Sequence, residues 1–148
     1  MSAGDYVIVR LGAQEFGIPV ADIRDVLRRQ KTTPVPLAPR AIAGLLNLRG
    51  RIATAIDLRL RLGLPPAAAS AEGTMVVVER EGELYALTVD AVGDVLRIEQ
   101  DRLEPVPAAR DPEWRHVATA VYAAAHGLIV LFDVGRLLDI VPRLRAAS

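Results

Sequence analysis

Residues 7–28 read VIVRLGAQEFGIPVADIRDVLR, and residues 76–97 read VVVEREGELYALTVDAVGDVLR. A shift of 69 positions superposes the two stretches without a gap, and 7 of the 22 positions are identical. Two further blocks recur in the same order, residues 34–36 at 105–107 and residues 56–58 at 132–134. Three ordered repeats indicate an internal duplication, which predicts two similar lobes.

Most of the repeated segments alternate apolar and polar residues, a period typical of β-strands. The alternation is clearest in residues 14–20, and two further strands flank a turn at residues 49–51. Between residues 20 and 29 the apolar side chains fall on one helical stripe, which predicts a short helix there and in its repeat. Residues 135–141 predict a closing C-terminal helix that ends before Pro142.

Residues 65–73 contain two prolines and no large apolar side chain, and we interpret them as a linker. We therefore expect a single domain over residues 5–142, with a first lobe at about 6–64 and a second at about 74–142. Strands as short as these predict a mainly β fold in which two small barrels share one core.

The composition excludes several classes of protein. The 148 residues carry 18 basic and 18 acidic side chains, a balance that disfavours binding to nucleic acid or an anionic membrane. The absence of cysteine removes disulfides and thiolate chemistry and is compatible with a reducing cytoplasm. The first residues lack the pattern of a signal peptide, and the apolar runs are shorter than the ~20 residues of a membrane span. We expect a cytoplasmic protein without direct membrane contact.

Side chains suited to catalysis or metal binding are scarce. The three serines, Ser2, Ser70 and Ser148, lie near the ends of the sequence and in the expected linker, so a serine triad is not expected. His116 and His126 lack the spacing of a metal site, and there is no glycine-rich phosphate loop. We expect no catalytic residues, no metal and no cofactor.

Two aspartates, Asp57 and Asp133, occupy equivalent positions after apolar strands. One interpretation makes them the acid/base groups of a small hydrolase or lyase. The interpretation that we favour is structural: each aspartate ends a strand and accepts hydrogen bonds from the backbone that follows. Asp25 and Asp94 form a second duplicated pair, which we expect on the solvated faces of equivalent helices.

Arg49 stands at the turn between two apolar strands. Its guanidinium offers five donors, which suits recognition of a partner's carboxylate or backbone. An internal salt bridge, for example to Asp57, fits the spacing equally well. The sequence pattern leaves both interpretations open.

The residues around this turn resemble the core motif of the CheW family. Gly44–Ile52 reads GLLNLRGRI and Ile56–Pro65 reads IDLRLRLGLP, matching the family's G-x-x-N-L-R-G-x-I and I-D-L-R-x-x-L-G-L-P. Further matches are Phe16–Val20, Leu87–Leu96 and Gly127–Leu138, so the resemblance covers about residues 5–141. CheW is the adaptor that couples bacterial chemoreceptors to the histidine kinase CheA.

The resemblance implies a fold of two five-stranded SH3-like barrels packed face to face, in which a strand can cross between lobes. It also implies a non-enzymatic scaffold of a bacterial chemosensory array. One surface would bind the regulatory domain of a CheA-type kinase, and an apolar groove between the lobes would take the tip of a chemoreceptor. The partner-binding residues implied by the matching motifs are Arg49, Asn47, Gly44 and Gly50 at the turn and Ile23, Val92 and Val95 near the groove.

The chain departs from the family pattern at two positions. The family commonly has Pro where this chain has Thr54 and Gly where it has Ala120, and we expect Ala120 to stiffen a turn and narrow the choice of partner. A small-molecule-sensing regulatory module is a further alternative to the adaptor. An open apolar groove favours the adaptor, whereas a closed pocket with converging carboxylates favours the sensing module or the hydrolase.

Overall fold

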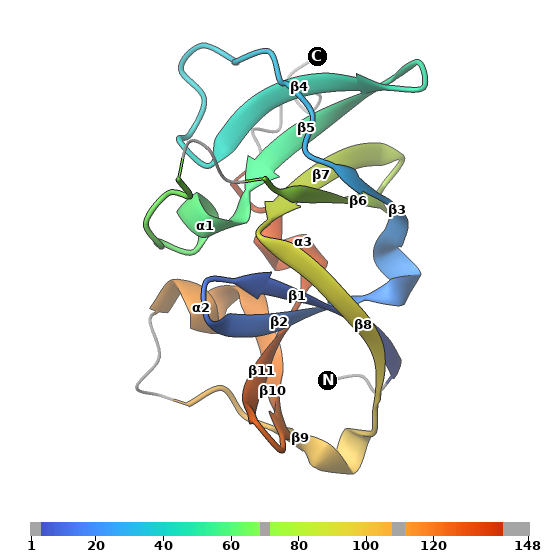
Figure 1. Ribbon diagram of the computed structural model, residues 1–148, viewed down its shortest axis with the longest axis vertical. Coiled ribbons are helices and arrows are strands. Elements are labelled where there is room, and N and C mark those ends of the chain that lie inside the picture. The colour runs from blue at the N-terminus through green and yellow to red at the C-terminus, as the bar shows by residue number, and fades with distance from the viewer. Residues whose placement is uncertain (1–3, 69–71, 108–111, 141–148) are drawn as a thin grey trace.

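The computed structural model describes residues 4–68, 72–107 and 112–140, which form two β-sheets, one above the other in Figure 1. The first sheet has six strands, in the spatial order β8 (Ala91–Ile98), β1 (Gly4–Leu11), β2 (Gln14–Pro19), β11 (Gly127–Phe132), β10 (Ala118–Ala124) and β9 (Leu103–Glu104). The second sheet has five, in the order β3 (Ile23–Arg28), β6 (Thr74–Arg80), β7 (Glu83–Val89), β5 (Arg51–Asp57) and β4 (Ile42–Leu48).

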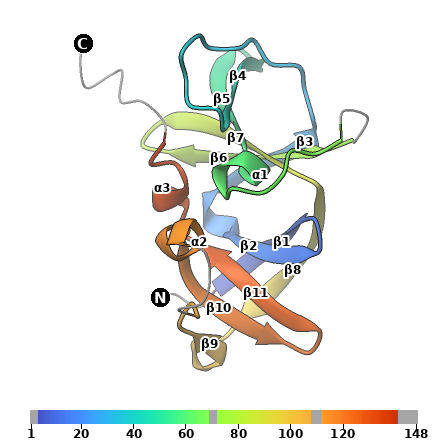
Figure 2. The ribbon, with the colours of Figure 1, turned by 90° about the vertical axis from the view of Figure 1, so that its left-hand side faces the viewer.

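Five short helical segments complete the fold. They are η1 (Val20–Asp22), α1 (Leu58–Arg61), η2 (Gln100–Arg102), α2 (Pro112–Val117) and α3 (Val134–Leu137). The three α-helices lie at the level where the two lobes meet (Figure 2). The predicted mainly β fold with short helices is confirmed, although one sheet has six strands because the two-residue β9 pairs with β10.

The two halves of the chain exchange hairpins. The β1–β2 hairpin joins the sheet of the second half through parallel pairing of β2 with β11. The β6–β7 hairpin joins the sheet of the first half through parallel pairing of β7 with β5. The expected lobe boundaries, 6–64 and 74–142, therefore do not follow the sheets: one lobe is built from residues 23–89, and the other combines 4–19 with 91–132.

Residues 20–29 do not form the predicted helix. Only Val20–Asp22 is helical, and β3 follows, pairing with β6 through a bulge between Ile23 and Asp25. Burial alternates along β3 with a period of two, so the helical spacing arises because a 3-10 turn precedes a bulged strand. Its repeat, β8, is also a strand, and Asp25 and Asp94 therefore lie on strands and not on helices.

The closing helix is shorter than predicted and begins earlier. Asp133 is its N-cap, and α3 ends at Leu137 instead of continuing to residue 141. Val141 and Pro142 lie outside the described residues, as does the part 69–71 of the expected linker.

The largest group of buried side chains lies between the sheets and belongs to both. It includes Val9 and Phe16 from one sheet and Val76 and Leu87 from the other. Phe16 stacks on Phe132 with ring centroids 4.9 Å apart. Each lobe also has a smaller apolar cluster of its own. Because the main core is shared, the relative position of the lobes is set by close packing.

Candidate partner-binding site

The β4–β5 hairpin ends in a two-residue turn formed by Arg49 and Gly50. Leu48 pairs with Arg51, and the backbone φ is 52° at Arg49 and 87° at Gly50. Positive φ at both positions is the type I′ geometry that suits the twist of a hairpin. The side-chain oxygen of Asn47 accepts a hydrogen bond of 2.8 Å from the backbone N–H of Gly50. Asn47 and Gly50 therefore build the turn, and Arg49 is the side chain that the turn presents.

The side chain of Arg49 is 90% exposed, and its Nη2 lies 3.4 Å from Oδ2 of Asp25. An internal salt bridge is thus present, but its partner is Asp25 on β3 and not Asp57. Solvent-exposed ion pairs of this kind typically contribute about 0–1 kcal/mol to stability. The pair orients the guanidinium beside β3 while leaving most of its donors accessible.

Gly44 has a structural role inside β4. Its φ is 149°, and a Cβ added there would lie 2.4 Å from the carbonyl oxygen of Thr33. Thr33 exchanges two backbone hydrogen bonds of 2.8 Å with Leu45 at this point. Gly44 is buried, so it allows the preceding loop to pass over β4 and offers no surface to a partner.

Apolar side chains flank the turn on one face of the hairpin. Ile52 is 57% exposed and Leu45 is 37% exposed. Asn47 lies opposite Ile52 and Leu45 lies opposite Thr54 in the β4–β5 register, so all four side chains share this face. We call Leu45, Asn47, Ile52 and Thr54 the hairpin face.

The three residues that the family resemblance places at the groove differ in exposure. Ile23 and Val92 are half-buried and pack against the shared core, whereas Val95 is 60% exposed. They belong to β3 and β8, which are edge strands of the two sheets. Val92 lines a pocket of about 870 Å³, but Ile23 and Val95 do not.

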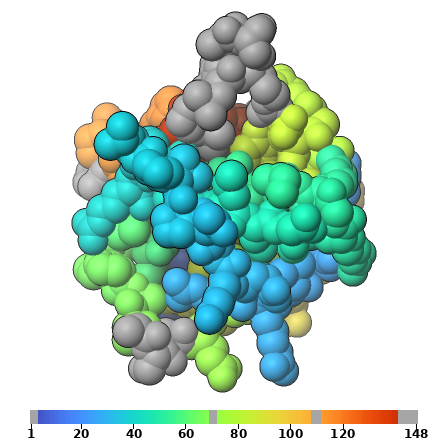
Figure 3. Space-filling view, turned by 90° about the horizontal axis from the view of Figure 1, so that it is seen from above, coloured from blue at the N-terminus to red at the C-terminus, as the bar shows by residue number. Residues whose placement is uncertain are grey.

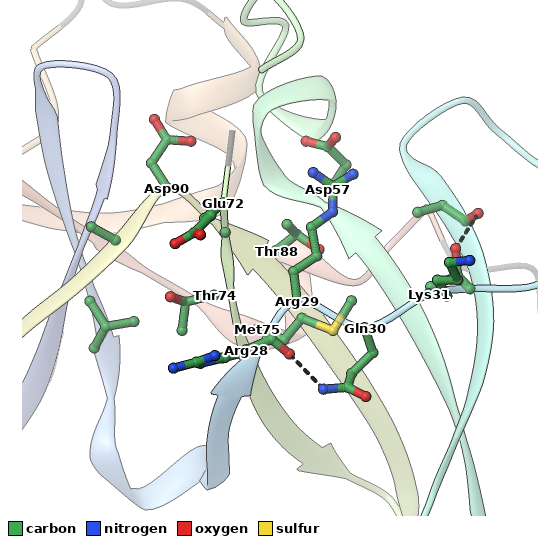
Figure 4. Close-up of a pocket in the computed structure, with 15 residues that line it drawn as sticks. Arg28, Arg29, Gln30, Lys31, Asp57, Glu72, Thr74, Met75, Thr88 and Asp90 are labelled. Atoms are coloured by element: carbon green, nitrogen blue, oxygen red, sulfur yellow. Dashed lines mark hydrogen bonds between the residues drawn. The ribbon is translucent and has the colours of Figure 1, made fainter. Parts of the chain in front are cut away.

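The walls of this pocket are mostly polar (Figure 4), so it is not the apolar channel expected at Ile23, Val92 and Val95, which stays a prediction. The pocket lies between the chain after β3, the start of β6 and the junction of β7 with β8. Its charged lining residues are Arg28, Arg29, Lys31, Asp57, Glu72 and Asp90. The lining is charged because the chain leaves β3 with the sequence RRQK, which the helix prediction for 20–29 placed at a helix end.

The duplicated aspartates have the structural role that we favoured. Oδ1 of Asp57 accepts a hydrogen bond of 3.2 Å from the backbone N–H of Leu60, as the N-cap of α1. Oδ1 of Asp133 accepts one of 3.0 Å from the N–H of Arg136, as the N-cap of α3. These contacts satisfy N–H groups that a helix start otherwise leaves without partners.

Asp90 holds three segments together at the junction of the lobes. It is the single residue between β7 and β8, and its carboxylate accepts hydrogen bonds from Arg59 Nε at 2.8 Å and Nη2 at 2.5 Å. It also accepts one of 2.7 Å from the N–H of Gly12 in the β1–β2 turn. The hydrogen bond from Arg59 is the main reason why the pKa of Asp90 lies below its ordinary value.

The sequence interpretation missed this arrangement, although the repeat contains a signal for it. The shifts that superpose the repeats place Asp90 over Ala21 and Arg59 over Gly135. Because both counterparts are uncharged, the two opposite charges point to an ion pair between the halves that Gly135 and Ala21 do not repeat.

A second arginine of α1 connects the helices of the two halves. The Arg61 side chain is buried, and its Nε donates to the carbonyl oxygen of Leu137 at 3.0 Å. Its Nη2 donates to the carbonyl oxygen of Arg136 at 3.1 Å. A buried guanidinium needs such acceptors, because a charge without partners is costly to bury.

Ala120 does not stiffen a turn. It lies inside β10, fully buried, beside an irregularity in the pairing with β11. Thr54 lies in the middle of β5, between Leu45 of β4 and Tyr85 of β7. Both departures from the family pattern are therefore within strands.

Two features of the described residues bear on other functions. In these parts of the chain, no three His, Asp or Glu side chains are grouped as ligands for a metal ion. No described helix is both long enough and apolar enough to cross a bilayer.

The model of the CheW-like domain family matches residues 5–141 of this chain. The chain belongs to the CheW-like domain family. A probable chemotaxis protein CheW from Rhizobium etli is 30% identical over 94% of this chain and 91% of its own length. Chemotaxis protein CheW from Rhizobium meliloti is 28% identical over 88% of this chain and 84% of its own length.

A solved structure agrees with these relatives. The crystal structure of the scaffolding protein TtCheW from Thermoanaerobacter tengcongensis superposes with a TM-score of 0.81 at 26% identity, covering 93% of this chain and 94% of that one. The CheW-like fold and the interpretation as a non-enzymatic chemotaxis adaptor are therefore confirmed. The hydrolase or lyase alternative is wrong.

Proposed function

We propose that this protein is a cytoplasmic adaptor that couples the tip of a chemoreceptor to the regulatory domain of a CheA-type histidine kinase. The observation that carries the proposal is the Arg49 turn, a rigid hairpin tip that holds an exposed guanidinium beside the edge strand β3. Arginine is enriched among the residues that dominate binding at protein interfaces. A protein that assembles others needs such anchors on more than one surface.

The second half of the chain supports a specialised role for this turn. A shift of 76 positions places Ala123, Ala125 and His126 of the β10–β11 hairpin over Asn47, Arg49 and Gly50. Both halves contain the hairpin, but only the β4–β5 hairpin has the asparagine that supports the turn and the arginine exposed at its tip. The fold alone does not require them.

We assign the receptor to the edges of β3 and β8. Val26 on β3 is 43% exposed and Val95 on β8 is 60% exposed, and the Arg49–Asp25 ion pair places the guanidinium next to β3. The apolar face of an amphipathic helix binds against exposed apolar side chains, and these two valines provide them for a helical receptor tip. We assign the kinase domain to the hairpin face, because a flat sheet surface with Leu45 and Ile52 suits a folded domain.

The proposal is tested by measuring the binding of each partner separately, together with thermal unfolding. We expect Arg49→Ala to retain the fold and to lower receptor affinity by about 2 kcal/mol, roughly 30-fold. Arg49→Lys is expected to rescue poorly, because an ammonium lacks the planar fork of the guanidinium. His126→Ala, at the equivalent turn of the second half, is the matched control. Unchanged binding of both partners to Arg49→Ala would show that the arginine has no role in coupling.

The two surfaces are separated by a reciprocal pair of variants. Val95→Asp should weaken receptor binding and leave kinase binding intact, whereas Ile52→Asp should do the reverse. Both side chains are more than half exposed, so neither change should unfold the protein. If both variants weaken the same partner, the assignment of two surfaces is wrong.

A further inference from the structure

The charges of this neutral chain are unevenly distributed. Between Asp25 and Asp57 there is no acidic residue, but there are six basic ones. This segment contains the end of β3, the loop before β4 and the β4–β5 hairpin, which gather on the face seen in Figure 3 in blue, cyan and green. The segment therefore gives one lobe a strongly cationic surface.

Two of the six basic residues have partners within the fold. Arg49 pairs with Asp25, and Arg51 lies 3.6 Å from Glu79 and donates to the carbonyl oxygen of Gly82. The other four, Arg28, Arg29, Lys31 and Arg40, are exposed and form no ion pair with any described residue. Folding therefore leaves these four charges available.

Three of the four free cations line the polar pocket, as Figure 4 shows for Arg28, Arg29 and Lys31. Of the carboxylates in the pocket, Asp90 is paired with Arg59 and also accepts from Gly12, whereas Asp57 caps α1 and keeps its charge. Glu72 is exposed, so three cations without an ion pair among the described residues share the pocket with two such carboxylates, Asp57 and Glu72. The pocket is suited to carboxylates brought by another molecule.

The loop before β4 presents an apolar side chain in an unusual backbone conformation. Leu37 is fully exposed and has φ 64°, and it follows Pro36 in a turn closed by a hydrogen bond of 3.3 Å from Ala38 N to Val35 O. Proline followed by a residue of positive φ is the type II pattern, which favours glycine or asparagine at the second of these positions. A leucine kept there without intramolecular contacts points to a role outside the fold.

We propose that Arg28, Arg29, Lys31, Arg40 and Leu37, which we call the cationic face, dock an acidic segment of a protein partner. The carboxylates of the partner would meet Arg28, Arg29 and Lys31 in the pocket and Arg40 in the loop before β4. An apolar recess on the partner would take the side chain of Leu37. The inference rests on the proposed adaptor function, because the pocket adjoins Val92 on the β8 edge that we assign to the receptor. It adds that the receptor tip carries acidic residues where it passes the end of β3.

Other anionic partners fit this surface less well. Membrane-surface binding uses a broad apolar face, and the cationic face has a single exposed leucine. Single-stranded nucleic acid is held by stacking on aromatic side chains, and none of the aromatic residues lies between residues 17 and 84. A pocket of about 870 Å³ lined by residues of five separate segments suits the side chains of a protein.

The test compares two variants that remove the same charge from different surfaces. The first replaces Arg28, Arg29, Lys31 and Arg40 by Gln. The control replaces four exposed arginines elsewhere by Gln, namely Arg10, Arg80, Arg115 and Arg136. Each full-length protein is titrated with the purified receptor tip and, separately, with the kinase regulatory domain, at low and high salt. We expect the first variant to bind the receptor tip about tenfold more weakly at low salt, with a smaller salt dependence, and the control to stay within about twofold.

Leu37→Asn gives an independent readout. Asparagine tolerates positive φ better than leucine, so the melting temperature should be unchanged or higher while receptor affinity falls about threefold. If Leu37 has only a structural role, Leu37→Asn would lower the melting temperature and the receptor affinity together, or would leave the receptor affinity unchanged.

Each outcome decides between the proposals. If the wild type binds neither partner, both the adaptor function and the cationic face are overturned. If the wild type binds both partners and the first variant matches the control, the adaptor function stands and the cationic face is overturned. Binding of the wild type to phosphatidylserine vesicles that depends on the four cations, with protein binding unaffected, would assign the face to a membrane instead.

Discussion

The helices α1 and α3 occupy equivalent places in the two halves of the chain but are connected differently. Both follow an apolar strand and both begin with a capping aspartate. Where α1 has Arg59 and Arg61, the shift of 76 positions places Gly135 and Leu137 in α3. Arg59 binds Asp90, whose counterpart is Ala21, and Arg61 binds the carbonyl groups of α3 itself.

The capping aspartates, present in both halves, stabilise each lobe by itself, whereas the arginines of α1 stabilise the contact between the lobes. A capping aspartate satisfies the helix that follows it, so each copy of the motif keeps its own. The arginine contacts cross from one half to the other, and α1 and α3 meet once. When one member of such a pair supplies the charged side chain, the other can only supply the acceptor. Asymmetry between α1 and α3 is therefore expected of a duplicated chain that packs against itself.

The largest effect is expected from removing the contact between α1 and α3. Arg61→Leu gives α1 the residue that α3 has at this position, and it removes the donor from the carbonyl group of Leu137. The carbonyl group of Arg136 loses one donor and keeps the backbone N–H of Asp139 at 3.2 Å. Hydrogen bonds to charged groups contribute about 1.5–3 kcal/mol, and the leucine recovers part of the loss by apolar burial. We expect unfolding free energy to fall by about 2–3 kcal/mol in urea denaturation. Arg115→Leu, at an exposed position of α2, should change it by less than about 0.5 kcal/mol. If both variants change the unfolding free energy equally, Arg61 does not stabilise the packing of the lobes.

An intermediate effect is expected from the ion pair between Arg59 and Asp90, which their counterparts Gly135 and Ala21 do not repeat. Asp90→Ala gives the β7–β8 junction the residue of its counterpart, and it should cost about 1–2 kcal/mol at neutral pH, since the pair is only partly exposed. Ala21→Asp is the reciprocal control, and it should be near neutral because the counterpart of Arg59 in the second half is Gly135, which cannot pair with the new carboxylate.

The same variant is expected to change the pH dependence of stability. The pKa of Asp90 is lowered in the folded protein, so its contribution is complete above the ordinary carboxyl pKa of about 3.9. The contribution is lost as the pH falls from there through the folded-state pKa. Wild-type unfolding free energy should therefore decline more steeply than that of Asp90→Ala below about pH 4. Parallel curves would mean that the carboxylate contributes nothing through its charge.

The sequence predicts the parts of this molecule that depend on local pattern. Alternation of apolar residues predicts β2, and the turn at residues 49–51 predicts the two strands β4 and β5 around it. The duplicated aspartates predict the acceptors of backbone hydrogen bonds after two strands, which the structure shows as helix caps. It fails at β3, where a 3-10 turn and a bulge imitate helical spacing. It also misplaces the lobe boundaries, because the hairpins are exchanged through the parallel pairing of β2 with β11 and of β7 with β5. Such pairing depends on contacts far apart in the chain, and periodicity does not record them.

The smallest effect is expected from the feature that the two halves share. Asp57→Ala and Asp133→Ala each remove one side-chain acceptor from the first turn of a four-residue helix, and each should cost about 1 kcal/mol. Asp57→Asn and Asp133→Asn should recover most of that loss, since asparagine caps about as well as aspartate. Because each cap acts within its own half, the double alanine variant should cost the sum of the single variants to within about 0.5 kcal/mol. The comparison is made by urea denaturation of the five variants beside the wild type. If Asp57→Ala costs much more than Asp133→Ala, the cap of α1 also positions Arg59 and Arg61. The stability of the contact between the halves would then depend on the cap of α1 more than on the cap of α3.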